Sequence, residues 1–182
     1  MRIISGHYGG RLLKSPPDHR TRPTSGRLRE TLFNILAPRI EGTRFLDLCS
    51  GSGAIGIEAL SRGAEFVTFV DRSRNACALI EENLDKLGVP EDETDVQNFE
   101  AETFVGRSHE VAWDIVFYDP PYSADYSVVL HEFGDKDGLL ANDGILIVEH
   151  LARKTMPDTV GSLRRWRLLK QGETHLSFYE KA

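Results

Sequence analysis

Residues 44–56, RFLDLCSGSGAIG, decide the fold that we predict for this chain. The first five residues are rich in apolar side chains and read as a short buried strand. Gly51 and Gly53 then allow the backbone to turn sharply, and a helical pattern begins near Ala54. Because the first turn of a helix has unpaired amide N–H groups, this loop suits a polar or charged ligand. The stretch predicts a strand, a ligand-binding loop and a helix, in that order.

The same alternation continues along the chain. Further strands are predicted at residues 65–70, 94–97, 114–118 and 145–149, and two antiparallel strands are predicted on either side of residues 172–173. The helix after Asp71 has an apolar face and ends at Gly88. Its apolar face comprises Cys77, Ile80, Leu84 and Leu87. Strands that alternate with helices predict an α/β fold with a parallel sheet.

Residues 1–40 have a different pattern and are expected to form an extension of the core at residues 41–182. Two apolar runs flank a glycine-rich connection in residues 1–13, which predicts a β-hairpin. A helix capped by Ser25 or Thr24 should follow and end before Pro38. Leucines at fourfold spacing mark this helix: Leu28, Leu32 and Leu36. At 182 residues the whole chain is expected to be one domain.

Charge is distributed unevenly along the chain. The net charge is −6, but residues 1–44 contain nine Lys and Arg and three acidic residues, so they sum to +6 and the other 138 residues sum to −12. A positive segment of this kind predicts contact with a polyanion such as RNA. The residues expected to contact phosphate are Arg11, Lys14, Arg20, Arg22 and Arg27, and Arg29 is grouped with them.

Composition excludes several other classes of protein. The sequence has no apolar run long enough to cross a membrane and no signal-peptide core at its start, so we expect a cytoplasmic protein. Cys49 and Cys77 lack the spacing of metal ligands and suggest neither a zinc site nor a disulfide framework. We expect no metal, and a monomer.

The glycine loop raises the question of which cofactor it binds. Gly51, Gly53 and Gly56 match G-x-G-x-x-G, and Asp71 ends the next strand, as in enzymes that bind NAD. However, Asp47 lies four residues before the first glycine, where a carboxylate would repel a pyrophosphate. S-adenosylmethionine has an ammonium and a sulfonium group instead. We therefore favour S-adenosylmethionine over NAD, and either cofactor over a turn that binds nothing.

Residues 114–122, DIVFYDPPY, place a carboxylate at the end of another strand. Pro120 and Pro121 force the chain off the sheet and fix the direction of the Asp119 side chain. The Asp119 carboxylate and the Pro120 carbonyl could accept both N–H groups of an exocyclic base amine and aim its lone pair at a sulfonium methyl. Tyr122 would offer a face on which the base stacks.

Together, DLCSGSG, Asp71 and DPPY resemble the class I S-adenosylmethionine-dependent methyltransferases that modify amines of adenine, cytosine or guanine. More narrowly, RIISGHYGGRLL, TRPTSGRLRETLFNIL and GSGAIGIEALSRGA resemble the bacterial 16S rRNA guanine-N2 methyltransferases. The resemblance implies a Rossmann-like fold. Its seven-stranded mixed sheet would have helices on both faces and a reversed last strand.

The resemblance also implies roles for residues. The cofactor, whose product is S-adenosylhomocysteine, would be bound by Asp47, Cys49, Ser50, Gly51, Ser52, Gly53, Asp71, Arg72, Glu100 and Ala101. The guanine would be received by Asp119, Pro120, Pro121 and Tyr122. The basic extension would help to hold 16S rRNA, in an assembled or partly assembled small ribosomal subunit.

Three alternatives stay open at this point. The enzyme could methylate adenine or cytosine in DNA or another RNA, it could be a nicotinamide-dependent oxidoreductase, or it could bind RNA without catalysis. The sequence offers no acid or base suited to hydride chemistry, which weakens the second alternative. Glu149 and the acidic residues 90–95 receive no role, and His150 is expected at a rim or in a loop.

Overall fold

The computed structural model describes residues 1–16 and 25–182. Its centre is one mixed sheet with the strand order β3-β2-β1-β4-β5-β8-β7-β6. The strands are β1 (Arg44–Leu48), β2 (Phe66–Val70), β3 (Thr94–Gln97), β4 (Trp113–Tyr118), β5 (Leu140–Leu151), β6 (Thr159–Val160), β7 (Leu163–Gln171) and β8 (Thr174–Lys181). The first five in chain order run parallel, and β6, β7 and β8 pair antiparallel.

The described sheet therefore has eight strands, whereas seven were predicted. The additional strand is β6, a two-residue edge strand that pairs with β7 through Thr159 and Val160. Two paired residues leave almost no periodic pattern in a sequence, which is why the alternation of apolar residues did not reveal it. The predicted parallel strands and the antiparallel strands near the C-terminus are confirmed.

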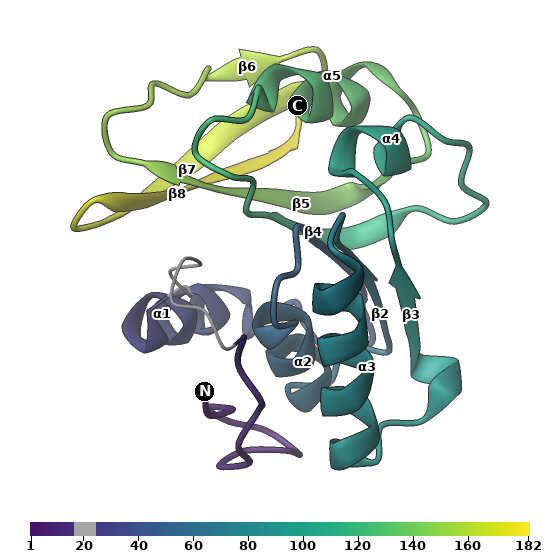
Figure 1. Cartoon of the computed structure of the whole chain (residues 1–182). Coiled ribbons are helices and arrows are strands. Elements are labelled where there is room, and N and C mark those ends of the chain that lie inside the picture. The colour runs from purple at the N-terminus through teal and green to yellow at the C-terminus, as the bar shows by residue number, and fades with distance from the viewer. Residues whose placement is uncertain (17–24) are drawn as a thin grey trace.

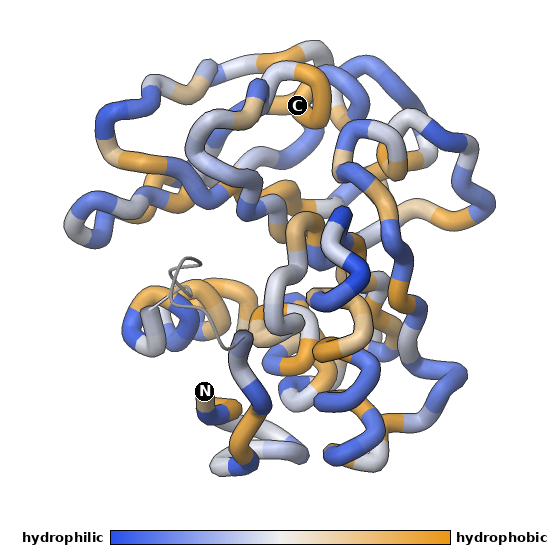
Figure 2. The backbone as a smooth tube through the Cα atoms, viewed as in Figure 1, coloured by the Kyte–Doolittle hydropathy of each residue, from blue (hydrophilic) through white to orange (hydrophobic). Residues whose placement is uncertain are grey.

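Helices cover both faces of the sheet. One face packs against α1 (Gly26–Leu36), α2 (Ala54–Ser61) and α3 (Arg74–Leu87), and the other packs against α4 (Ala101–Val105) and α5 (Tyr126–Asp135). A short 3-10 helix, η1 (Glu91–Glu93), precedes β3. Figure 1 shows the two groups of helices on opposite sides of the central strands. Figure 2 shows hydrophobic residues along α1, α2 and these strands, with hydrophilic residues in the outer loops. None of the helices in the described ranges is long and apolar enough to span a membrane.

Local signals set the ends of the predicted helices. Ser25 caps α1 by accepting a hydrogen bond from the Leu28 amide, and Ser73 does the same for α3 through the Ala76 amide. Gly88 ends α3 in the left-handed conformation that favours glycine, with φ of 72°. The Ser25 cap and the Gly88 end are as predicted, while Thr24 lies outside the described residues.

The two arms of the N-terminal segment pair antiparallel, as the predicted hairpin requires, although the pairing is too short to form named strands. They are joined by the Arg2–Leu12 bridge and by backbone hydrogen bonds from the amides of Ile3, Gly10 and Leu13 to carbonyls of the opposite arm. The backbone also bonds to α2: the amides of Ile4 and Ser5 donate to the Glu58 carboxylate at 2.8 and 3.1 Å. Gly6 lies so close to the end of α2 that an added Cβ would clash with backbone there. Docking on α2 therefore holds the paired arms against the core.

Candidate active site

The glycine loop lies between β1 and α2 and has a backbone that few residues adopt. Cys49, Gly51 and Gly53 have positive φ values of 63°, 55° and 74°. Gly53 also caps α2, where an added Cβ would lie 3.0 Å from Ile80. At Gly51 an added Cβ would meet nothing within 4 Å, so the loop has open space beside it. Ser50 fastens the loop to β2, because its hydroxyl accepts a bond from the Val70 amide at 2.9 Å.

Asp47 lies under this loop. It is only 2% exposed, and its carboxylate accepts a hydrogen bond of 2.9 Å from the Gly56 amide in the first turn of α2. Burial raises the pKa of Asp47 to about 7, and the Asp71 carboxylate adds to the rise. The side chain thus holds the start of α2. Its contact with a cofactor ammonium stays a prediction.

Asp71 joins the glycine loop to the start of α3. One carboxylate oxygen accepts from the Gly51 amide at 2.9 Å, and the other accepts from the Ser73 amide at 2.8 Å. Arg72 and Glu100 are exposed nearby, with 3.9 Å between their charged groups. Ala101, which is buried, begins α4 directly after Glu100. The structure therefore brings together, at the carboxyl ends of β1, β2 and β3, most of the residues predicted to hold a cofactor.

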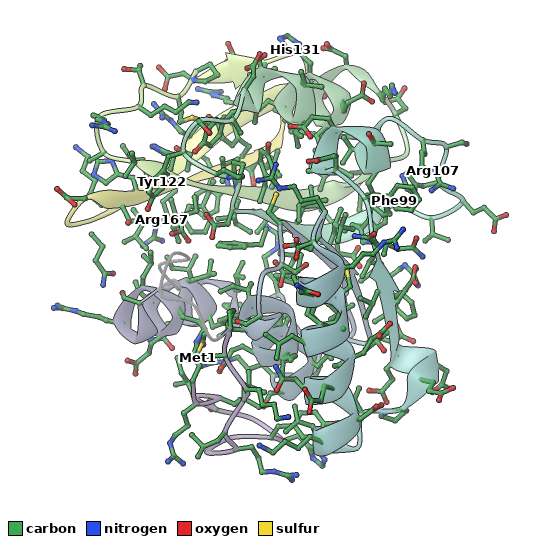
Figure 3. The ribbon with its side chains drawn as sticks, in the orientation of Figure 1. Met1, Phe99, Arg107, Tyr122, His131 and Arg167 are labelled. Atoms are coloured by element: carbon green, nitrogen blue, oxygen red, sulfur yellow. The ribbon has the colours of Figure 1, made fainter. Side chains whose placement is uncertain are left out.

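The DPPY segment, residues 119–122, follows β4 beside that loop. The Asp119 amide donates to the Leu48 carbonyl at 3.2 Å, which extends the pairing of β4 with β1 by one residue. The Pro121 carbonyl accepts from the Ala124 amide at 2.8 Å and closes a turn. Pro120 is buried, whereas Tyr122 is 47% exposed, and Figure 3 labels it on the side of the view above α1. The turn leaves Asp119 half-buried and the Tyr122 ring accessible.

Three acidic residues come from neighbouring strands in this region. Asp47 belongs to β1, Asp119 follows β4, and Glu149 belongs to β5 and is 5% exposed. Burial raises the pKa of Asp119 well above its usual range, and the Glu149 and Asp47 carboxylates raise it further. Such raised pKa values are typical of functional sites. Among the described residues, no group of three or more His, Cys, Asp or Glu side chains is arranged to hold a metal.

Comparison with known proteins identifies the family and the fold of the chain. The model of the family described as Conserved hypothetical protein 95 matches residues 1–180. The chain belongs to this family. YlbH of Bacillus subtilis is 37% identical over the whole chain and 99% of its own length. Ribosomal RNA small subunit methyltransferase D of Escherichia coli is 33% identical and is covered over 90% of its length. The solved structure of Escherichia coli yhhF has a TM-score of 0.86 at 33% identity, covering 100% of this chain and 97% of that one. The fold is therefore that of a class I methyltransferase.

The candidate site contains a residue that sequence reasoning missed, Lys154. Its ammonium donates to the Ala124 carbonyl at 3.1 Å and lies 3.5 Å from the centre of the Tyr126 ring. Lys154 comes from the loop after β5, so it ties that loop to the turn that follows DPPY. An isolated lysine in a polar loop gives no sequence signal, because its partners lie about 30 residues away.

The residues predicted to contact RNA lie in different parts of the structure. Arg11 donates to the Lys86 carbonyl in the last turn of α3, and the Lys14 ammonium pairs with Glu82. Both therefore lie along α3, away from its first turn beside Asp71. Arg27 is exposed at the start of α1. Arg20 and Arg22 lie outside the described residues.

Arg29 departs from the sequence interpretation. It is buried, its guanidinium donates to the Arg2 carbonyl at 2.5 Å, and its Nε lies 3.9 Å from Glu58. Arg29 thus holds the N-terminal segment and does not face a phosphate. The helical spacing of Leu28, Leu32 and Leu36 did not exclude a buried arginine, since its partner Glu58 is far away in sequence.

His150 was expected at a rim or in a loop, but it lies buried within β5. Its Nε2 is 2.9 Å from the Ser177 hydroxyl and its Nδ1 is 3.0 Å from the Leu151 carbonyl. Burial lowers the pKa of His150, so it is neutral at physiological pH. Surface hollows of about 400 and 310 Å³ lie beside α4, and both are lined in part by residues 107–109 and not by Asp119.

Proposed function

We propose that this protein transfers a methyl group from S-adenosylmethionine to the exocyclic N2 amine of a guanine in 16S rRNA. The observation that carries the proposal is the placement of Asp119 and Pro120 on a fixed turn, at the end of β4 and next to the glycine loop after β1. Relatives that match nearly the full chain are named ribosomal RNA small subunit methyltransferase D, and they support an rRNA substrate.

The residues around the loop suit this cofactor. Gly51 leaves open space beside the loop, and the acids Asp47 and Asp71 favour a cationic, ribose-containing ligand over a pyrophosphate. Bound S-adenosylmethionine would supply a methyl group already activated by its positive sulfur. The raised pKa of Asp47 would fall when an ammonium group binds beside it.

The DPPY residues would prepare the amine. The N2 lone pair of guanine is delocalised into the ring, so the free amine is a poor nucleophile. Asp119 and the Pro120 carbonyl accept its two N–H groups and direct the lone pair toward the methyl group. The nitrogen would lose one proton as it takes the methyl group from the sulfonium, and the Asp119 carboxylate would accept that proton. Tyr122 stacks on the flipped base.

The substrate is proposed to be an assembled or partly assembled small subunit, with the enzyme acting as a monomer. A chain of 182 residues has little surface with which to select one guanine, so the shape of a folded particle would supply the missing selectivity. Arg27 and the basic residues outside the described ranges would contact phosphate.

The test is methyl transfer from labelled S-adenosylmethionine to unmodified small subunits, with naked 16S rRNA in parallel. The product nucleoside is identified by mass spectrometry. N2-methylguanosine is the expected product. A methylated adenine or cytosine would keep the chemistry and replace the substrate, and no transfer to either RNA would reject the proposal. Titration with S-adenosylmethionine and with NAD separates the oxidoreductase alternative.

A further inference from the structure

Glu149 occupies the position on β5 that Asp119 occupies on β4. The two strands are parallel, and Tyr118 of β4 pairs with Val148 of β5. The residues that follow this pair are Asp119 after β4 and Glu149 in β5. Two residues earlier, the paired Phe117 and Ile147 both belong to the core under α1, α2 and α3. Because alternate residues of a strand face the same side, Asp119 and Glu149 project toward that same face.

The two carboxyl groups are also electrostatically coupled. After burial, Glu149 is the strongest contributor to the raised pKa of Asp119, ahead of Asp47. Two neighbouring carboxylates repel each other, and donors of hydrogen bonds reduce the repulsion. A ligand that brings several N–H groups on one edge would do so.

Guanine, adenine and cytosine differ in the hydrogen-bonding groups that lie beside their exocyclic amine. The Watson–Crick edge of guanine presents the N1–H next to the two N2–H groups, so three hydrogens lie in a row. Adenine and cytosine each present a ring nitrogen acceptor beside their amine, and that lone pair would face a carboxylate. A pair of carboxyl groups therefore matches guanine and opposes the other two amine-bearing bases.

We propose that Glu149 accepts the N1–H of the target guanine while Asp119 accepts from the N2 amine, which makes Glu149 the residue that selects guanine. This inference rests on the proposed function and names the selectivity of the same site. A carboxylate can accept about four hydrogen bonds, so this role is compatible with the contacts that Glu149 makes within the protein. Glu149 holds the base through N1, and the reacting nitrogen is left to Asp119 and Pro120.

The experiment compares guanine with 2-aminopurine at the methylated position, in small subunits assembled from RNA that contains either base there. 2-Aminopurine keeps the reacting amine, but its N1 has a lone pair and no hydrogen. Wild-type enzyme should have a kcat/KM for guanine at least about a hundredfold above that for 2-aminopurine, since a site built to bond an N–H rejects an analogue without it. Glu149→Gln can donate to N1, so its preference for guanine should fall at least tenfold, with a rise in kcat/KM for 2-aminopurine.

Glu180→Gln is the matched control, because Glu180 lies on β8 opposite Ile145, toward the other end of β5. It should leave the preference unchanged, and titration with S-adenosylmethionine should show that Glu149→Gln keeps its fold. An equal loss on both bases, or no change on either, would overturn the role of Glu149 and leave the guanine-N2 reaction standing. A wild-type product other than N2-methylguanosine would overturn the proposed function and this inference together.

Discussion

Two regions of the molecule bury charged side chains, and they do so in opposite ways. Where the N-terminal segment meets α2, opposite charges are paired: Glu58 is fully buried, accepts a bond of 2.8 Å from Arg62, and lies 3.9 Å from Arg29. At the carboxyl ends of β1, β4 and β5, three groups of like charge come together. The first region pairs opposite charges, whereas the second brings carboxyl groups of the same sign close to one another.

This difference shows that burial of charge does not by itself mark a functional site. Burial lowers the pKa of Arg29, and Glu58 opposes that shift by favouring the charged form. For Asp119, burial and its neighbours all raise the pKa. The Arg29–Glu58 pair therefore stays charged. The mutual repulsion of the acidic groups would be reduced by a bound cation or N–H donor.

The largest expected effect is a loss of stability when the Glu58 carboxylate is removed from its buried ion pairs. Glu58→Ala would leave Arg29 buried without its carboxylate and remove the acceptor of the Ile4 and Ser5 amides. Breaking a buried pair costs about 3–5 kcal/mol, so urea denaturation should show a loss of this order in the free energy of unfolding. Asp158→Asn, at an exposed ion pair with Arg165, should change it by less than about 1 kcal/mol. A loss as small for Glu58→Ala would mean that the pair contributes little.

Substitution of Asp119, in the region of like charges, should lower turnover and leave stability unchanged. Asp119→Ala removes an acceptor of the N2 amine, so kcat should fall by at least about a hundredfold, in line with the loss of one preorganised polar group. Affinity for S-adenosylmethionine and thermal stability should hold, because the substitution also removes a repelled carboxyl group. Asp143→Ala, on an exposed part of β5, is the control. Unchanged turnover in Asp119→Ala would exclude the proposed role.

The two regions also differ in how far the sequence predicts them. The strand ends, the glycine loop and the DPPY turn are local features, since each depends on residues within about ten positions of one another. Local patterns alone therefore place Asp47, Asp71 and Asp119 at one edge of a parallel sheet. The pairing of β4 with β5, which aligns Asp119 with Glu149, depends on the order of the strands and is seen only in the folded sheet.

The N-terminal region could not be predicted as well, because its bonds join distant parts of the chain. Arg29 and Glu58 are 29 residues apart, and the amides of Ile4 and Ser5 reach Glu58 over more than 50 residues. On a helical pattern alone, Arg29 reads as solvent-exposed.

A smaller effect should come from the pH dependence of cofactor binding. Because the pKa of Asp47 is raised from 3.8 to about 7 in the unliganded protein, the carboxyl group is neutral below that pH. A cationic cofactor favours the charged form, so the Kd of S-adenosylmethionine should increase as pH falls below about 7, approaching tenfold per pH unit. The same shift means that the free protein loses stability as pH rises from about 4 to about 7.

Calorimetric titration between pH 5.5 and 8 measures this dependence. Asp47→Asn keeps an acceptor for the Gly56 amide but cannot ionise, so it should bind more weakly and with a flatter pH profile. If wild type and Asp47→Asn had parallel profiles, another group would be responsible for the dependence, and Asp47 would have only its structural role under the glycine loop.

The smallest expected effect concerns Lys154, which joins the loop after β5 to the turn that follows DPPY. Lys154 donates to the Ala124 carbonyl and lies over the Tyr126 ring, so Lys154→Met would loosen the turn that positions Tyr122 without removing any group that touches the base. We expect kcat to fall about three- to tenfold, because a slightly misplaced base reacts more slowly. Lys154→Arg, which keeps the cation over the ring, should restore most of the rate. Lys136→Met, in an exposed pair with Glu132, should have no effect. If arginine and methionine lowered kcat equally, the charge over Tyr126 would not be what holds the turn.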